Sequence, residues 1–159
     1  MMHYFKSAWS GYVQPMLQRP KRLQVAALCF RGSGDTTQVL LVTSRGTGRW
    51  IIPKGWPMTG KTSAEAALQE AWEEAGVEGG TCNGRIMGSY TYEKRKKDGW
   101  SMTVETLVYA VAVDDVCDSY PEADQRRRTW VTPQQAATMV DEPELQQILM
   151  AFDPDNIPG

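Results

Sequence analysis

The chain has 159 residues, which is enough for one domain with an apolar core and too few for two ordinary domains. Apolar residues make up 42% of the sequence and charged residues 23%, a composition that excludes a disordered or fibrous chain. The net charge is −2, and the longest apolar run, residues 107–113, is far shorter than the roughly 18 residues that span a bilayer, so we expect no association with a membrane.

The rare residue types exclude several kinds of active site. His3 is the only histidine, which argues against a Ser-His-Asp triad, a Cys-His pair or an HExxH zinc site. The three cysteines, Cys29, Cys82 and Cys117, are widely spaced and form no CxxC pair. We interpret them as reduced thiols and expect a cytoplasmic protein. Catalysis would then depend on carboxylates, which suit magnesium, and on basic side chains, which suit phosphate.

The first part of the chain has the pattern of a β-rich domain that follows an extension. Residues 1–20 lack the apolar core of a signal peptide, and we assign them to an N-terminal extension. Strands are predicted at 23–30 and 38–43, with a turn-forming Gly-Ser-Gly-Asp segment between them. A short apolar run at 50–52 precedes a predicted loop at 54–61.

The strongest helix signal lies at residues 62–76. Thr62 and Glu65 have the spacing of a capping box, alanine and glutamate dominate the following turns, and Gly76 is a typical helix stop. On a helical wheel the alanines and Leu68 fall on one side, where they can pack against a sheet.

After this helix we predict a hairpin and two helices. The hairpin strands are expected at 85–92 and 101–113, with a tip at 93–99, and Trp130-Val131 reads as a short extended segment. The helices are expected at 133–140 and 142–152. Strands that alternate with helices indicate a single α/β domain, which we place at 21–152 with a tail at 153–159.

Basic residues gather at three places on this mildly acidic chain. Ten of the 17 lysines and arginines lie at Arg19, Lys21 and Arg22, at Lys94 to Lys97, and at Arg126 to Arg128. Any one cluster alone is as compatible with a solvated surface as with an anion site. Together they indicate a local anion site rather than a nucleic-acid surface.

Three glutamates on the predicted helix indicate metal chemistry. Glu70, Glu73 and Glu74 are neighbours at i, i+3 and i+4, which places like charges within about 6 Å of each other and costs stability in an isolated helix. A divalent cation would turn this repulsion into coordination. A solvated acidic face is the alternative interpretation.

The sequence from Gly55, GWPMTGKTSAEAALQEAWEEAGV, resembles the Nudix box, whose pattern is G-x5-E-x7-R-E-U-x-E-E-x-G-U with U aliphatic. The positions that match are Gly55, Glu70, Glu73, Glu74, Gly76 and Val77, with Ala71 at an aliphatic position. Two positions differ, because Lys61 replaces the Glu and Gln69 replaces the Arg of the pattern. This loss puts the support of the glutamates in question, and Glu65 is one residue that could compensate.

The resemblance extends over about residues 21–150. The segments KRLQVAALCFR, VLLVTSRGTGRWIIPKG, the basic hairpin and QRRRTW occur in an order similar to that of diphosphoinositol and dinucleoside polyphosphate phosphohydrolases. It implies the Nudix α/β/α sandwich with a mixed central sheet and hydrolysis of a phosphoanhydride bond. The expected substrate is a small polyphosphate, either a dinucleoside polyphosphate or a diphosphoinositol polyphosphate.

The resemblance also implies a Mg²⁺ (or Mn²⁺) site. Glu70, Glu74 and a main-chain carbonyl at the junction of Lys54 and Gly55 would hold the ion. Glu73 would be a further ligand or the general base, and we favour it as the base. Such chemistry agrees with the reaction, which needs a water nucleophile, a base and cations at the developing charge.

The remaining functional assignments concern the alternative base and the substrate. Glu122, in a later loop, is the alternative general base. The residues expected to bind phosphates are Arg22, Arg45, Lys96, Lys97, Arg126 and Arg127. Trp50, Trp56, Trp100 and Tyr90 could either stack on a base or pack in the fold. The sequence does not determine the oligomeric state, and a homodimer is left open.

Rival interpretations stay open at this point. Residues 55–62 also satisfy the P-loop pattern GxxxxGKT, which would indicate an NTPase or phosphotransferase, although Pro57 has no N–H to offer a phosphate. Lys61 and Gln69 are compatible with a non-catalytic ligand sensor on the Nudix fold. Removal of 5′ phosphates from RNA is a fourth reading, but no pI above about 9 and no stripe of aromatic and basic residues supports it.

Overall fold

The structure is a computed structural model, and it describes residues 22–158. The expected N-terminal extension at 1–20, which includes Arg19, lies outside the described residues, as does Lys21. The strands are β1 (Arg22–Arg31), β2 (Gln38–Thr43), β3 (Trp50–Ile51), β4 (Lys54–Gly55), β5 (Val77–Cys82), β6 (Gly88–Arg95), β7 (Ser101–Val116) and β8 (Arg128–Val131). The helices are the 3-10 turn η1 (Gly34–Thr36), α2 (Ser63–Ala75), α3 (Pro133–Met139) and α4 (Pro143–Ala151).

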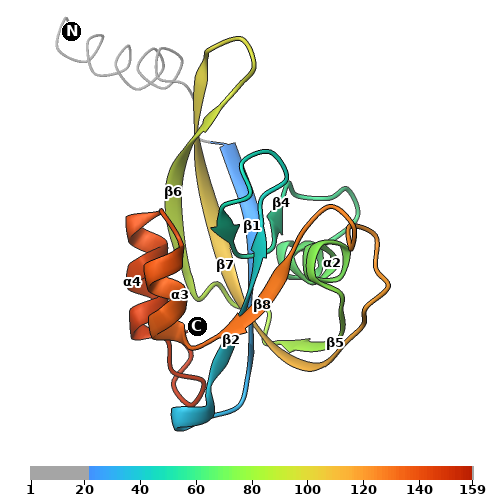
Figure 1. The fold of residues 1–159 in the computed structure, drawn as a ribbon, viewed down its shortest axis with the longest axis vertical. Helices are drawn as coiled ribbons and strands as arrows, with labels where there is room; N and C mark the ends of the chain where they lie inside the picture. The colour runs from blue at the N-terminus through green and yellow to red at the C-terminus, as the bar shows by residue number, and fades with distance from the viewer. Residues whose placement is uncertain (1–21, 159) are drawn as a thin grey trace, which may run out of the picture.

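A mixed sheet forms the centre of the described domain (Figure 1). Its central strands, β1 and β7, run parallel and pair from Arg22 with Val104 to Phe30 with Ala112. The other edge of β7 pairs antiparallel with β6 along its first half and with β5 along its second half. The other edge of β1 pairs with β4 and then with β2, and β2 continues the sheet to β3 and β8.

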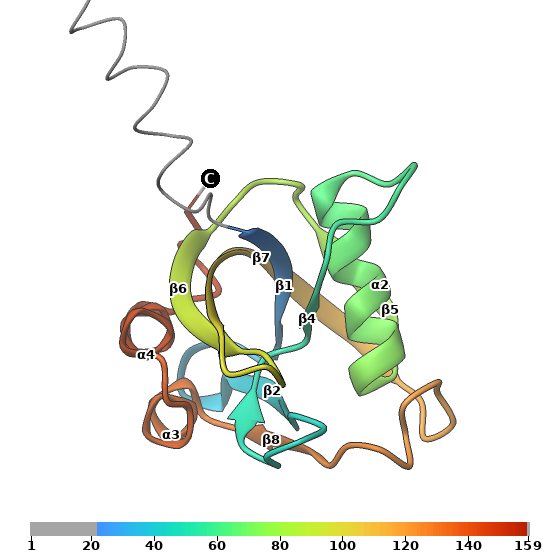
Figure 2. The ribbon, with the colours of Figure 1, turned by 90° about the horizontal axis from the view of Figure 1, so that it is seen from above.

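Helices cover both faces of this sheet, with α2 on one side and α3 and α4 on the other (Figure 2). The alternation of side chains along β1 divides the core between the two faces. Val25, Ala27 and Cys29 pack in the cluster that includes α2, whereas Ala26 and Leu28 pack in the cluster that includes α3 and α4. The predicted α/β class and the α/β/α sandwich are therefore confirmed.

The predicted glutamate-rich helix is present as α2, with both of its predicted ends. The Thr62 hydroxyl accepts a hydrogen bond from Glu65 N (3.1 Å), and Glu65 Oε1 accepts one from Thr62 N (2.8 Å), which completes the capping box. Gly76 follows the last turn with φ of 73°, a left-handed conformation that favours glycine. Ala67 and Ala71 are fully buried against the sheet, as the helical wheel predicts.

The hairpin differs from its prediction in length. Strand β6 begins three residues later than expected and continues to Arg95, while β7 extends to Val116. The ladder continues past the expected tip because Glu93 pairs with Thr103, whose hydroxyl donates to Glu93 Oε1 (2.6 Å), and Arg95 pairs with Ser101. The turn is thus limited to 96–100, and the predicted tip at 93–99 was wrong.

Two short strands were absent from the prediction. Residues 77–82 contain Gly79 and Gly80, which weaken the β signal, yet β5 forms because β7 offers it an antiparallel partner. The predicted loop at 54–61 begins with β4, because Lys54 and Gly55 pair with the middle of β1. In both cases a neighbour distant in sequence stabilises the strand.

The other elements follow the sequence closely. The strands predicted at 23–30 and 38–43 are confirmed to within one residue. Thr132 caps α3, whose first residue is Pro133, and α4 begins at Pro143. No helix within residues 22–158 has both the length and the apolar character needed to cross a membrane.

Candidate active site

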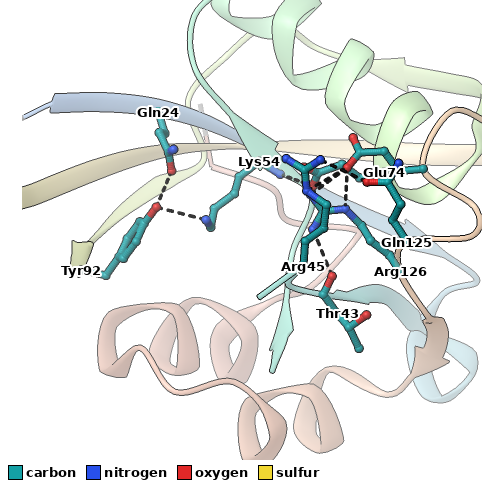
Figure 3. A network of polar contacts seen from close by, with 9 residues as sticks. Gln24, Thr43, Arg45, Lys54, Glu74, Tyr92, Gln125 and Arg126 are labelled. Atoms are coloured by element: carbon teal, nitrogen blue, oxygen red, sulfur yellow. Dashed lines mark hydrogen bonds and ion pairs between the residues drawn. The ribbon is translucent and has the colours of Figure 1, made fainter. Parts of the chain in front are cut away.

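A cleft of about 790 Å³ opens where β4 meets α2. Its walls come from the loop between β2 and β3, from β4, from the last turns of α2, from the hairpin and from the loop that precedes β8. Figure 3 shows part of the polar network that surrounds it. The fold thus brings segments far apart in sequence around one opening.

Helix α2 places Glu70 and Glu74 on the wall of the cleft that faces β4. They are one turn apart and are 8% and 4% exposed. The Lys54 main-chain N–H donates to Glu74 Oε1 (3.1 Å). Strand β4 lies so close to the helix that a Cβ atom at Gly55 would overlap the Glu70 carboxylate. The glycine therefore allows main chain and carboxylate to meet.

Burial and like charge raise the pKa of Glu70 to about 8. Burial is the largest cause, followed by the negative charges of Glu74, Glu73 and Glu122. Burial also raises the pKa of Glu74, although the neighbouring Arg126 opposes this effect. These carboxylates therefore oppose each other's ionisation, and a divalent cation that coordinates them would remove this penalty.

A buried arginine from the loop before β8 enters this cluster. Arg126, whose side chain is 7% exposed, directs Nη2 to Glu74 Oε2 (2.9 Å) and to Glu122 Oε1 (3.0 Å). Its Nη1 donates to the carbonyl of Thr43 (3.0 Å), and Arg45 approaches Glu122 from the solvent side (3.5 Å). Figure 3 shows Arg126 beside Glu74 and Thr43, with Arg45 next to it. The loop is thereby fixed against both α2 and β2.

The two departures from the Nudix box have different surroundings. Gln69 Nε2 donates to Glu73 Oε1 (3.0 Å), so the position still holds a glutamate of the cluster. The Glu122 main-chain N–H donates to the Glu73 carbonyl (3.0 Å), so the two candidate bases are neighbours in space although they are far apart in sequence. Lys61 lines a separate hollow on the outer side of α2, and the Glu65 carboxylate caps the helix instead of supporting Gln69.

The opposite wall of the cleft is positively charged. Lys54 Nζ donates to the Tyr92 hydroxyl (3.1 Å), which donates to Gln24 Oε1 (2.7 Å), as Figure 3 shows. Burial is the main reason that the pKa of Lys54 falls to about 8, and the positive charges of Arg49 and Lys94 lower it further. These cations face the glutamates across the opening.

Two basic residues of this wall, Lys94 and Arg49, were not among the expected phosphate-binding residues, although Lys94 belongs to a predicted basic cluster. Lys94 lies with its Nζ 5.2 Å from the centre of the Trp56 ring, at the mouth of the cleft. The period-two alternation of the hairpin strand could have indicated it, because Tyr92 and Lys94 share one face. Arg49 has no comparable signal, since its position depends on an ion pair with Glu142, which is 93 residues away in the chain.

The structure brings together some of the nominated residues and separates others. Those around the cleft are Lys54, Gly55, Glu70, Glu73, Glu74, Glu122, Arg45 and Arg126. Arg22 and Lys96 line a second hollow beside the hairpin, which shares Glu93 with the cleft. Lys97 is exposed in the hairpin turn, and Arg127 stacks on Trp50, 5.5 Å from its ring centre.

The carboxylate oxygens on the α2 side of the cleft are the type of ligand that magnesium and manganese ions prefer. Among residues 22–158, no three His, Cys, Asp or Glu side chains are spaced so that they hold a metal ion as they stand. Both oxygens of Glu74 have donors, and Glu70 interacts with Glu74 rather than with a cation within the described chain. A hard cation could bind between these carboxylates after small movements of their side chains, and it would then compensate their negative charge.

The aromatic residues have unequal positions. Tyr90 is 1% exposed and belongs to the core beneath α3 and α4. Trp56 is 41% exposed at the cleft, and Trp100 is 59% exposed beside the second hollow. Of the aromatics considered for base stacking, Trp56 is thus the one that lines the glutamate cleft.

The P-loop pattern at 55–62 has a different structural context. A P-loop joins a strand to a helix whose N-terminal N–H groups face the phosphate. Here the preceding strand is the two-residue β4, and the capping box occupies the main-chain N–H groups of Thr62 and Glu65. This geometry does not support the rival NTPase interpretation.

A family model of the NUDIX domain matches residues 20–152 of this sequence. The match covers well over half of the chain and includes every wall of the cleft. The chain belongs to the NUDIX family. The predicted Nudix resemblance is therefore confirmed.

Individual relatives of this NUDIX chain are more distant. Bovine diphosphoinositol polyphosphate phosphohydrolase 3-beta is 30% identical over 109 residues, which cover 67% of this chain and 62% of that protein. Nudix hydrolase 16, mitochondrial, of Arabidopsis thaliana is 29% identical over 156 residues, which cover 90% of this chain and 86% of that protein. The chain spans roughly three fifths of the length of the mammalian relatives that it matches.

A solved structure shows the same fold. The C. elegans Ap4A hydrolase superimposes with a TM-score of 0.60 and 21% identity, and the match covers 82% of this NUDIX chain and 95% of that one. At this identity the likeness concerns the fold.

Proposed function

We propose that this protein hydrolyses a phosphoanhydride bond in a small polyphosphate, either a dinucleoside polyphosphate or a diphosphoinositol polyphosphate. The observation that carries the proposal is the convergence of four glutamates, Glu70, Glu73, Glu74 and Glu122, on one wall of a cleft whose other wall is cationic. The bovine relative is named for diphosphoinositol polyphosphates and the nematode structure for Ap4A, so each name supports one of the two substrate classes.

Mg²⁺ or Mn²⁺ is the cofactor in this proposal. Glu70 and Glu74 would hold the ion together with a main-chain carbonyl at the junction of Lys54 and Gly55. The ion neutralises phosphate oxygens and lowers the pKa of a water molecule when it is bound. The close approach of β4 to Glu70 supports this set, because Gly55 brings the main chain to the carboxylate.

Glu73 is the proposed general base. Its carboxylate is half-buried and is held by Gln69 at 3.0 Å, so it is oriented without being neutralised by an arginine. Glu122 is the alternative base, but Arg126 and Arg45 both contact its carboxylate. These two cations restrain the Glu122 carboxylate, whereas Glu73 is held by the neutral Gln69 amide and is freer to orient a water molecule.

The nominated basic residues would bind the substrate at two depths. Arg45 and Arg126 lie at the glutamate wall, where they would contact phosphates close to the reacting bond. Lys96 and Arg22 line the adjoining hollow, and Lys97 and Arg127 are exposed nearby, so this group would contact the more distant phosphates of long substrates. Arginine can offer paired donors to phosphate, which supports this division.

A catalytically impaired ligand-binding protein is the second candidate. The observation in its favour is the loss of the Glu and Arg of the Nudix box, with Lys61 directed away from the cleft. Such a protein would bind polyphosphates tightly without turning them over.

A metal-dependent hydrolysis screen tests the proposal. The screen would include dinucleoside polyphosphates, inositol pyrophosphates, nucleotide sugars, nucleoside triphosphates and triphosphorylated RNA, each with Mg²⁺, with Mn²⁺ and with EDTA. Glu70→Gln and Glu74→Gln should each lower kcat by orders of magnitude and keep the far-UV spectrum, whereas the exposed Glu78→Gln should keep wild-type rates. Wild-type rates in either active-site variant would refute the assignment, and binding without turnover would favour the second candidate.

A further inference from the structure

An ion pair with one partner at the cleft and the other buried connects the cleft to the helical layer behind it. Arg49 lies at the end of the loop between β2 and β3, lines the cleft, and directs Nη1 to Glu142 Oε2 at 2.8 Å. The Arg49 side chain is 32% exposed and the Glu142 side chain 6%. The guanidinium is therefore half open to the cleft, while its partner is enclosed by protein.

Glu142 occupies the N-cap position of α4 but does not cap the helix. Its side chain makes no hydrogen bond to the first turn of α4. Among residues 22–158, its one side-chain hydrogen bond goes to Arg49, and its Oε1 atom is buried without a partner. A buried carboxylate with an unsatisfied oxygen is destabilising. Holding Arg49 is thus the visible effect of this carboxylate.

The surroundings of Glu142 are polar and buried. The hydroxyls of Tyr90 and Thr106, a cross-strand pair of the hairpin, are also buried. Burial is the main reason that the pKa of Tyr90 is raised, and the negative charge of Glu142 raises it further. This enclosed setting leaves the carboxylate little freedom to move, so it provides a fixed anchor for the guanidinium.

The main chain at Arg49 is fixed as well. Ser44 N donates to the Arg49 carbonyl (2.8 Å), and Arg49 N donates to Ser44 Oγ (3.2 Å), which closes the loop. Among the described residues, Glu142 takes only one guanidinium nitrogen, so the other N–H donors of Arg49 are available to a ligand. Lys54 and Lys94 line the same wall and lie close enough for Arg49 to act on Lys54 electrostatically.

We propose that Arg49 binds a phosphate group of the substrate and that Glu142 is the positioning residue that orients its guanidinium toward the cleft. This inference rests on the proposed function, since it concerns the same cleft. A prearranged guanidinium binds phosphate with less loss of side-chain entropy than a free one. The ligand class is an oxyanion chain, such as a diphosphate or triphosphate, that crosses from the glutamate wall to the cationic wall.

Binding of inorganic tripolyphosphate to the metal-free protein in EDTA tests the inference independently of catalysis. By isothermal titration calorimetry, Arg49→Gln should weaken binding about tenfold, which corresponds to about 1.4 kcal/mol. Arg49→Lys should give an intermediate loss, because lysine keeps the charge but lacks the fork. The matched control is Arg31→Gln, which removes a charge from an arginine stacked on Trp130 outside the cleft and should bind as the wild type does.

A double-mutant cycle tests the role of Glu142. Glu142→Gln should weaken tripolyphosphate binding several-fold in the wild type and have no further effect in the Arg49→Gln background. The neighbouring exposed residue gives the control Asp141→Asn, which should be neutral. Additive losses would overturn the positioning role of Glu142, and unchanged binding in Arg49→Gln would overturn the whole inference.

Kinetics separates this inference from the proposed function. With diadenosine tetraphosphate and Mg²⁺, Arg49→Gln should raise KM with little change in kcat, the sign of a residue that binds rather than reacts. If the wild type binds tripolyphosphate through Arg49 but hydrolyses none of the screened substrates, the proposed function fails and the assignment of Arg49 stands. If the wild type hydrolyses a substrate and Arg49→Gln leaves KM unchanged, only the inference fails.

Discussion

Arg126 Nη2 lies 2.9 Å from Glu74 Oε2, and both side chains are almost completely buried. The same nitrogen lies 3.0 Å from Glu122 Oε1, so one guanidinium joins helix α2 to the loop before β8. Within the described chain, this arginine is the direct cationic partner of Glu74. The site is thereby held in shape by the protein itself.

Removal of the Arg126 guanidinium should destabilise the metal-free protein. Arg126→Gln leaves the buried Glu74 without its cationic partner and removes one of the two cations at the partly exposed Glu122, so the free energy of unfolding should fall by about 3 kcal/mol. Saturating Mg²⁺ should restore part of the loss, because a bound ion replaces the missing charge. Urea unfolding in EDTA and in Mg²⁺ measures both effects, with the exposed Arg127→Gln as the control. Equal stability of Arg126→Gln and the control in EDTA would contradict the role of Arg126.

A methyl group at Gly55 should disturb the metal site without any change of charge. The Cβ atom of Gly55→Ala would overlap the Glu70 carboxylate, so either β4 or the side chain must move. We expect Mn²⁺ affinity, followed by electron paramagnetic resonance, to fall about tenfold, within the range that affects metal sites when supporting contacts are lost. Gly46→Ala meets no atom within 4 Å and is the control. Unchanged Mn²⁺ binding in Gly55→Ala would argue against a site at this junction.

Basic residues in the cleft and basic residues in the hairpin turn should affect KM differently as the substrate becomes longer. Lys94→Gln removes a charge from the cleft wall beside Trp56. This variant should raise KM several-fold for every substrate, whatever its number of phosphates. Lys97→Gln acts in the exposed hairpin turn and should raise KM only for substrates with many phosphates. The measurement compares KM across a series of dinucleoside polyphosphates of increasing length. The same KM ratio for both variants at every length would reject the division.

The capping box of α2 should contribute to stability in a pH-dependent way. The main-chain and side-chain hydrogen bonds of Thr62 lower the pKa of Glu65 below its usual 4.5. A carboxylate with a lowered pKa in the folded state stabilises the fold above its unfolded pKa, and this contribution is lost as the pH falls through the folded pKa. Glu65→Gln should therefore lower Tm at pH 7, and its difference from the wild type should shrink as the pH falls below the usual pKa of 4.5. A difference in Tm that stays constant over this pH range would exclude a charge effect.

Thiol reactivity should distinguish the three cysteines. Burial, with a smaller effect of Cys82, raises the pKa of Cys29 to about 12, so this thiol stays protonated and enclosed in the core at neutral pH. Ellman's reagent should titrate Cys82 and Cys117, which are partly exposed, in the native protein. A variant with Cys82→Ser and Cys117→Ser should react only after unfolding. Fast reaction of this variant in native buffer would place Cys29 outside the core.

Local patterns in the sequence predicted the parts of the fold that depend on neighbours along the chain. The capping box and Gly76 predicted both ends of α2, because these signals lie within one turn of the helix ends. Alternation predicted β1 and β2, whereas β4 and β5 were missed, because two residues or a glycine pair carry too little signal and form strands only beside β1 and β7.

In the candidate site, too, some features follow from local sequence and others depend on contacts between distant segments. By itself the sequence determined that Glu70, Glu73 and Glu74 share one side of a helix, because the period of an α-helix fixes which residues are neighbours. Only the tertiary structure decided that Arg126 enters that cluster, that Gly55 meets Glu70, and that Arg49 is held from behind by a residue of α4's N-cap. The physical reason is distance along the chain: contacts between segments dozens of residues apart are set by how the layers pack, and no local periodicity encodes them.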